Sequence, residues 1–210
     1  MKNQQILFSR RNKVVLNNED GIKKIIKTYA DKERCQIEYQ TLLDLPNSLV
    51  PKVLEKGEKF ICLEYIEGEL LLDEFLKADT EKAKELAIKL ANFINDFRTI
   101  LRKKIPNDEN FRNYIITKNN LYRIDLEQTS NGTLEQYLAQ VISFATLHSQ
   151  VDEVCVEFSH TLIQATNPNL ANAKNDYTKY LTMLAYRWKV PFPQELYNKV
   201  LERNCPLNNY

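Results

Sequence analysis

The apolar residues of this chain change their spacing along its length, and this change limits the folds that it can adopt. Between residues 5 and 29, short apolar runs such as Ile6-Leu7-Phe8 alternate with polar turns. Runs of this length with β-branched residues favour antiparallel strands over helices. From Thr80 to about Lys104 the apolar residues instead recur at helical spacing, which predicts a long core helix.

The first part of the chain is therefore predicted to form a sheet that carries one helix. Further strands are expected at 14–16, 25–26, 50–54 and 60–66. Residues 31–45 have the apolar spacing of a helix, which Pro46 ends. Five antiparallel strands and one helix would form a small lobe over about residues 1–67.

The remainder of the chain is predicted to be mainly helical. Helical patterns cover about residues 133–148, 152–165, 171–188 and 193–203. At 210 residues the chain is long enough for one domain with two lobes and short for two independent domains. We expect an α+β fold in a single domain, residues 1–210, whose second lobe covers about residues 68–210.

Composition excludes several classes of function. Lysine and arginine number 29 against 28 aspartates and glutamates, so the sequence predicts no nucleic-acid partner. Four separated cysteines and two histidines offer little for a zinc site. The chain has neither a signal-peptide core nor a run of about 20 apolar residues, so we expect a cytoplasmic protein without a transmembrane segment.

The stretch from Asp108 to Glu127 contains the side chains that most directly indicate a function. Asp108, Asn113 and Asp125 are separated by a predicted strand, turn and strand, which could gather their oxygen atoms at one place. Oxygen donors suit Mg2+, and a carboxylate can accept a proton from a hydroxyl group. A solvated loop and an acid at a strand end would explain each residue singly.

Several separately placed motifs resemble those of the protein-kinase-like superfamily. Lys27, in Ile25-Ile26-Lys27, resembles the lysine of the third strand, and Glu38 resembles its ion-pair partner on the first helix. The run 63–68 is similar to the hinge between the lobes, where the backbone of Glu64 and Ile66 would meet adenine. Taken alone, this run would be explained better by a plain edge strand that ends at Gly68, and only the other motifs favour the hinge.

The resemblance also assigns roles to the polar residues of the second half. Asp108 and Asn113 match the Asp-x-x-x-x-Asn of the catalytic loop, and Asp125 matches the metal-binding acid of the Asp-Phe-Gly motif. It implies that Asp108 orients the acceptor hydroxyl and that Asn113 and Asp125 bind Mg2+. Lys27 would then contact the phosphates of ATP, with Glu38 fixing the lysine.

Three departures from the family pattern bear on activity. The first turn, Ser9 to Asn12, contains no glycine, so phosphates would meet Ser9, Arg10 or Arg11, unless the two arginines are simply solvated. Pro106 stands where histidine is common. Leu126-Glu127 replaces Phe-Gly.

The last of these departures narrows the resemblance within the superfamily. The acid-x-acid pattern, here Asp125-Leu126-Glu127, resembles the pattern of aminoglycoside and choline kinases. Only a short link separates it from the next predicted helix, which leaves no room for a long activation segment. The resemblance thus implies an ATP- and Mg2+-dependent phosphotransferase that acts on a hydroxyl of a small molecule, sugar or envelope glycan. A minimal atypical protein kinase with a protein substrate, a nucleotide-binding pseudokinase and an interaction scaffold remain alternatives.

Overall fold

The computed structural model describes residues 3–7, 12–19 and 21–204. Contacts between Cα atoms divide the chain into two compact units. The N-terminal unit comprises residues 1–68 and 115–129, and the C-terminal unit comprises residues 69–114 and 130–210. The expected assembly of the whole chain into one domain, with its lobes divided near residue 67, stays a prediction.

A five-stranded antiparallel sheet forms most of the N-terminal unit, as predicted. Its strand order is β1-β2-β3-β5-β4. The strands are β1 (Asn3–Leu7), β2 (Lys13–Glu19), β3 (Ile22–Thr28), β4 (Val53–Lys56) and β5 (Phe60–Glu64). In this register Lys27 lies opposite Val14 on one side and Ile61 on the other, which places it inside the sheet. Phe8 and Ser9 to Arg11 lie outside the described residues.

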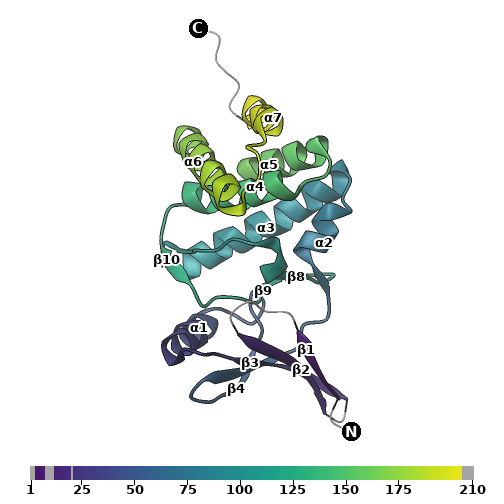
Figure 1. Ribbon diagram of the computed structural model, residues 1–210, viewed down its shortest axis with the longest axis vertical. Coiled ribbons are helices and arrows are strands. Elements are labelled where there is room, and N and C mark those ends of the chain that lie inside the picture. Colours follow the sequence, from purple (N-terminus) through teal and green to yellow (C-terminus); the bar gives the residue numbers. More distant parts are fainter. Residues whose placement is uncertain (1–2, 8–11, 20, 205–210) are drawn as a thin grey trace. The chain divides into compact units, whose positions relative to one another are not determined.

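The predicted helix of this unit is α1 (Lys32–Asp44), drawn beside the sheet in Figure 1. It begins at Asp31, whose side chain accepts a hydrogen bond from the Glu33 amide at 2.8 Å. It ends before Leu45, which adopts an extended conformation ahead of proline. Its buried face includes Cys35, Glu38 and Leu42, so a charged side chain is held within an apolar surface.

A short hairpin from later in the sequence completes the N-terminal unit. It consists of β8 (Tyr114–Ile116), whose first residue is counted in the C-terminal unit, and β9 (Leu121–Arg123). The Thr117 amide closes the turn between them by donating to the Asn120 carbonyl at 2.9 Å. The Arg123 amide donates to the Leu49 carbonyl at 2.8 Å, which fixes β9 in the unit. A Cβ on Gly68 would lie 2.3 Å from the Ile116 carbonyl oxygen, so only glycine permits this close approach.

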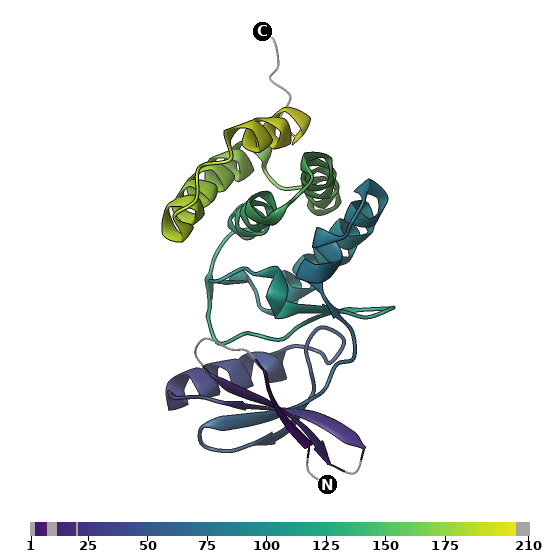
Figure 2. The same ribbon diagram turned by 45° about the vertical axis from the view of Figure 1, so that its right-hand side comes forward.

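The C-terminal unit is mainly helical, as predicted (Figure 2). Its helices are α2 (Leu71–Leu76), α3 (Thr80–Ile100), the 3-10 turn η1 (Phe111–Asn113), α4 (Leu134–His148), α5 (Asp152–Thr166), α6 (Leu170–Trp188) and α7 (Gln194–Asn204). The short strands are β6 (Glu69–Leu70), β7 (Lys104–Pro106) and β10 (Thr129–Asn131), the last of which begins in the N-terminal unit. Helix α2 and these short strands were not predicted.

Helix α3 ends at Ile100, earlier than the expected end near Lys104. Arg102 and Lys103 have φ angles of 43° and 77°. Backbone in this left-handed region cannot continue a right-handed helix, so the helix stops there. Residues 101–103 then lead the chain into β7, which ends two residues before Asp108.

The core of the C-terminal unit lies where α3 packs on α5 and α4 packs on α6. Aromatic side chains fill much of it, and those with less than 2% exposure include Phe97, Phe111, Phe144 and Phe158. Across residues 3–7, 12–19 and 21–204, no helix combines the length and apolar character needed to cross a bilayer.

Candidate functional site

Lys27 connects three segments of the N-terminal unit. Its ammonium donates to Glu38 Oε2 at 2.7 Å and to Asp125 Oδ1 at 2.9 Å. Strand β3 supplies the lysine, helix α1 the glutamate, and the segment after β9 the aspartate. The structure therefore brings together three of the residues that the sequence singled out, although Asp125 lies 98 positions from Lys27.

Burial makes this ion pair sensitive to the loss of either partner. The side chains of Lys27 and Glu38 are 7% and 0% exposed. Burial alone would lower the pKa of Lys27, but the charges of Glu38 and Asp125 outweigh it and hold that pKa above its ordinary value. Burial raises the pKa of the Glu38 carboxyl, and the Lys27 ammonium opposes this rise. The lysine is therefore a charged group held in one position.

Two more donors fix the Glu38 carboxylate. The Tyr29 hydroxyl donates to Oε2 at 2.6 Å, and the Leu126 amide donates to Oε1 at 3.3 Å. Burial, followed by the charge of Glu38, raises the pKa of Tyr29, so the hydroxyl stays protonated as a donor. With Lys27 on one oxygen as well, both Glu38 oxygens have protein partners.

Asp125 follows a strand whose last residue supports it. Arg123 is 1% exposed, and its Nε donates to the Asp125 carbonyl at 3.1 Å. Leu126 is 1% exposed and anchors the chain on the other side of Asp125. The Asp125 side chain itself is 39% exposed, so its backbone is fixed while its carboxylate remains accessible.

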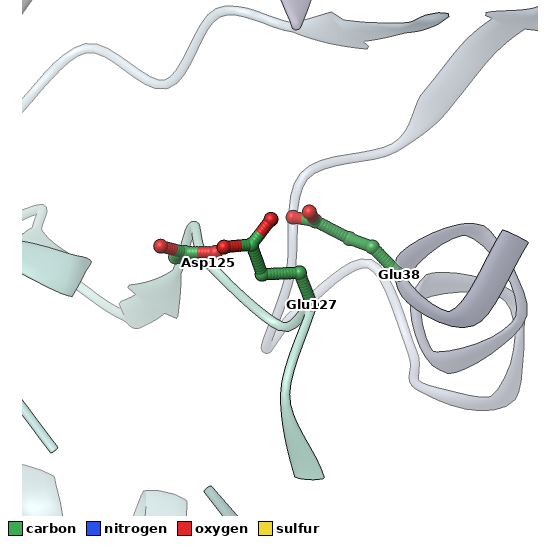
Figure 3. Close-up of side chains that lie close together, drawn as sticks. All are labelled: Glu38, Asp125 and Glu127. Atoms are coloured by element: carbon green, nitrogen blue, oxygen red, sulfur yellow. The ribbon is translucent and has the colours of Figure 1, made fainter. Parts of the chain in front are cut away.

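A third acid, Glu127, lies beside Glu38 and Asp125. One carboxylate oxygen from each of the three residues lies within 4.8 Å of the others (Figure 3). Glu127 is 6% exposed. Its Oε2 accepts a hydrogen bond from Asn12 Nδ2 at 2.9 Å, and its Oε1 lies 4.0 Å from Arg34 Nη1.

The predicted hinge residues are Glu64, the last residue of β5, and Ile66, two positions further along the chain. The Glu64 amide donates to the Lys52 carbonyl at 3.0 Å, and the Lys52 amide donates to the Glu64 carboxylate at 2.8 Å. The ammonium of Lys23 lies 5.0 Å from the centre of the Tyr65 ring. Ile66 is half-buried. These contacts fix the run, while its role toward adenine stays a prediction.

Asp108 and Asn113 belong to the C-terminal unit, and their approach to Asp125 stays a prediction from the motif. Asp108 is exposed and Asn113 half-buried. Phe111, between them, is fully buried and lies 4.8 Å from the ring of Phe144, measured between centroids. The Asn113 amide donates to the Asn110 carbonyl at 2.9 Å. A buried aromatic ring thus fixes the loop that carries both polar side chains.

Tyr180 on α6 lies within electrostatic range of this loop. Burial, followed by the negative charges of Asp108 and Glu109, raises the pKa of Tyr180 to about 12. Its hydroxyl therefore remains protonated over the physiological pH range. Sequence reasoning did not identify this residue, because nothing in its helical context distinguishes it from a core tyrosine.

The sequence also did not identify Tyr29, Arg123, Asn12 or Arg34 as members of the site. Tyr29, Asn12 and Arg34 contact the carboxylates of Glu38 or Glu127 from other elements of the unit. Arg123 instead donates to the backbone carbonyl of Asp125, two positions along the chain. One signal was available for Arg123, since a charged residue in a short strand two positions before Asp125 requires a polar partner if it is buried. The others carry no comparable pattern.

No protein-family model and no curated protein sequence matches the chain. Among solved structures, the streptomycin–ATP–APH(2'')-IIa ternary complex matches with a TM-score of 0.63 and 14% identity, covering 93% of this chain and 93% of that chain. ADP-bound aminoglycoside phosphotransferase APH(2'')-Ib matches with a TM-score of 0.62 and 14% identity, covering 97% and 92%.

A third structure, WaaP in complex with acyl carrier protein, matches with a TM-score of 0.60 and 14% identity, covering 93% of this chain and 90% of that chain. These likenesses establish a protein-kinase-like fold, which the chain shares with WaaP and with aminoglycoside phosphotransferases. The predicted α+β fold class and the resemblance stated from the motifs are both confirmed at the level of the fold.

Proposed function

We propose that this protein is an ATP- and Mg2+-dependent phosphotransferase that transfers the γ-phosphate to a hydroxyl group. The observation that carries the proposal is the bridge from the Lys27 ammonium to Glu38 and Asp125, at 2.7 and 2.9 Å. A lysine anchored by a buried glutamate beside a partly exposed acid is the arrangement that positions phosphates in kinases. The shared fold supports it independently.

The side chains of the N-terminal unit fit a magnesium nucleotide. Lys27 offers a fixed positive charge for the α and β phosphates, and Glu38 prevents it from turning away. The exposed carboxylate of Asp125 offers an oxygen ligand of the kind that Mg2+ prefers. Bound Mg2+ would neutralise charge on the transferring phosphate. The backbone of Glu64 and Ile66 would meet the adenine edge.

The loop of the C-terminal unit would supply the remaining groups. Asp108 would orient the acceptor hydroxyl and accept its proton, and Asn113 would provide a second oxygen ligand for Mg2+. Phe111 supports this assignment, because its burial fixes the spacing between the two side chains. The two units would then act together as one kinase-like domain.

The acceptor that fits best is a hydroxyl of a small molecule, sugar or envelope glycan. Support comes from the acid-x-acid pattern of Asp125 and Glu127 and from the fold shared with aminoglycoside phosphotransferases. Such a substrate pool and ATP both occur in the cytoplasm, which is the compartment we propose. Incubation with labelled ATP and separate small-molecule and protein extracts distinguishes this acceptor from the protein hydroxyl of an atypical protein kinase.

Substitution of Asp125 tests the assignment directly. Asp125→Ala should lower phosphate transfer by at least about a hundredfold, because charge stabilisation at the phosphates would be lost. Asp96→Ala, an exposed acid on α3, is the matched control and should transfer normally. Unchanged transfer by Asp125→Ala would contradict the proposed function.

A pseudokinase is the second candidate, because the first turn lacks glycine and Pro106 stands two positions before Asp108, where kinases commonly have histidine. Thermal unfolding with and without Mg-ATP, followed by a turnover assay, separates the two functions. Metal-dependent stabilisation without product favours the pseudokinase. Product formation favours the enzyme, and the absence of any stabilisation favours a scaffold that binds no nucleotide.

A further inference from the structure

We propose that the C-terminal unit binds its acceptor as an anionic sugar, with Trp188 contacting the sugar ring and Arg112 and Arg187 binding its phosphate or carboxylate. This inference rests on the proposed function and deepens it, because it names the chemical class of the acceptor. All three residues belong to the C-terminal unit, so the site is described within that unit alone.

A series of aromatic rings links the loop that carries Asp108 to the end of α6. Phe111 of this loop lies 4.8 Å from Phe144 on α4, measured between ring centroids. Phe144 stacks on His148 at 3.9 Å. Trp188 stands nearly perpendicular to both rings, 6.0 Å from Phe144 and 5.1 Å from His148. The indole is therefore fixed by rings that lead directly from the loop.

The indole is fixed by its neighbours and yet remains accessible. Trp188 is 36% exposed, whereas Phe111 and Phe144 are 0% and 1% exposed. An indole offers a broad apolar surface, which suits the C–H groups on one face of a sugar ring. Because its orientation is set before any ligand arrives, contact with a sugar ring costs little conformational entropy.

Arg187 carries a positive charge on the face of α6 that lies near this loop. It follows Tyr180 by two helical turns, which places the two side chains on the same face of the helix. The charges of Asp108, Glu109 and Arg187 all act on the Tyr180 hydroxyl. Arg187 is exposed. Its guanidinium is thus available to a ligand that lies beside Asp108.

Arg112 adds a second positive charge, from the loop itself. Burial lowers the pKa of His148, and the charge of Arg112 adds to this effect, so the two side chains are neighbours. Both arginines are exposed, and within the part of the chain that the structure describes no carboxylate forms an ion pair with either guanidinium. Two positive charges without a protein counter-ion favour an anionic ligand, and a guanidinium matches phosphate and carboxylate in shape.

His148 supplies a group that can accept a sugar hydroxyl. Its Nδ1 lies 3.0 Å from the Phe144 carbonyl oxygen. A carbonyl oxygen only accepts hydrogen bonds, so Nδ1 carries the proton and donates. The lowered pKa keeps the imidazole neutral at physiological pH, and Nε2 is then an acceptor.

A purely structural indole with two solvated arginines is the main alternative. It would explain the packing of Trp188 on His148, and it predicts that sugars leave the environment of the indole unchanged. The acceptor site is favoured because an exposed indole and two unpaired guanidinium groups occur together beside the loop that carries Asp108.

Trp188 is the only tryptophan of the chain, so intrinsic fluorescence reports on this site alone. The full-length protein is titrated without ATP. The ligands are glucose and galactose, each as the neutral sugar, its uronic acid and its 1-phosphate, with glucosamine as a cationic sugar. We expect the anionic sugars to change the fluorescence and to bind at least about tenfold more tightly than the others. Their affinity should fall as the ionic strength rises, because salt screens the charges.

Substitution of the arginines tests the charge. Arg112→Gln and Arg187→Gln should each weaken the binding of anionic sugars about tenfold and leave the binding of neutral sugars unchanged. Arg203→Gln removes the same charge from an exposed position on α7, is the matched control and should bind as wild type. Far-UV circular dichroism verifies that each variant is folded.

Substitution of the indole tests the ring contact, with titration calorimetry in place of fluorescence. Trp188→Ala should weaken the binding of anionic and neutral sugars alike, and Trp188→Phe should retain most of the affinity because a ring remains. Tyr186→Ala, which alters an 87% exposed ring on the same helix, is the control and should bind as wild type.

Three results would overturn the inference: no binding of any anionic sugar, equal binding of anionic and neutral sugars, or wild-type affinity for anionic sugars in both arginine variants. Transfer from labelled ATP is measured on the same sugars. Binding of anionic sugars without transfer to any acceptor would contradict the proposed function and leave the binding site in place. Transfer confined to neutral or cationic sugars would contradict the inference while the proposed function stands.

Discussion

Lys27 and Glu38 form a buried ion pair in which the ammonium lies 2.7 Å from the carboxylate. The Tyr29 hydroxyl donates to the same carboxylate oxygen at 2.6 Å. The two opposite charges have little access to water, so each one stabilises the other in its buried position. Removing either charge would leave the other buried without this partner. Stability and the proposed positioning of phosphates depend on the same contact.

Removing Glu38 should therefore destabilise the protein as well as stop phosphate transfer. Glu38→Ala leaves Lys27 with Asp125 as an ion-pair partner, and breaking a buried pair costs about 3–5 kcal/mol of unfolding free energy. Urea denaturation followed by circular dichroism measures the loss. Gln36→Ala, exposed on the same helix, should change the unfolding free energy by about 0.5 kcal/mol or less. A variant at Glu38 as stable as the control would show that the pair is not structural.

Tyr29→Phe should lower the free energy of unfolding without removing a charge from the buried ion pair. The substitution deletes the hydroxyl that donates to Glu38, and leaving a buried acceptor with one donor fewer costs about 1–3 kcal/mol. Urea denaturation of wild type and Tyr29→Phe measures this difference in unfolding free energy. Tyr186→Phe is a suitable comparison because Tyr186 is 87% exposed, and equal stability of the two variants would argue against the bond.

Phe111→Ala should unfold the C-terminal unit more readily and disturb the loop from Asp108 to Asn113. The ring is fully buried and lies 5.3 Å from Phe75 and 5.6 Å from Phe158, measured between centroids. Truncation of such a side chain costs about 3–5 kcal/mol. Calorimetry or urea denaturation measures this.

For comparison, Met183→Ala alters a side chain that is 45% exposed and should be nearly neutral. If Phe111→Ala were equally mild, the loop would have to be held in place by other contacts. Phosphate transfer should also decline in the Phe111 variant, because the spacing of Asp108 and Asn113 would no longer be fixed.

Tyr180 should titrate with a pKa of about 12. Because this value lies above that of an unfolded tyrosine, near 10, Tyr180 contributes stability that is fully present below about pH 10. That stability is lost as the pH rises toward 12. The difference in alkaline ultraviolet absorbance between wild type and Tyr180→Phe isolates this group.

Asp108→Asn should lower the pKa of Tyr180, because one negative charge beside the forming phenolate disappears. Asp96→Asn should leave it unchanged. An unaltered titration in the Asp108 variant would show that the charge of Asp108 does not influence Tyr180.

Much of the fold could be predicted because local patterns carry it. Short apolar runs between polar turns predicted the strands of the five-stranded sheet, and helical spacing predicted α1, α3 and the four helices from α4 to α7. Helix α2, six residues long, is too short to display a periodic pattern. The end of α3 depended on the left-handed backbone of Arg102 and Lys103, which no spacing of apolar residues indicates.

The sequence by itself determined the chemical groups available to the site: one lysine at the end of a strand, one glutamate on the following helix and an acid after a hairpin. Only the tertiary structure decided that Lys27 bonds to both Glu38 and Asp125, and that Glu127 holds Asn12. The physical reason is that local patterns select strands and helices, whereas contacts across 98 or 115 positions depend on how those elements pack.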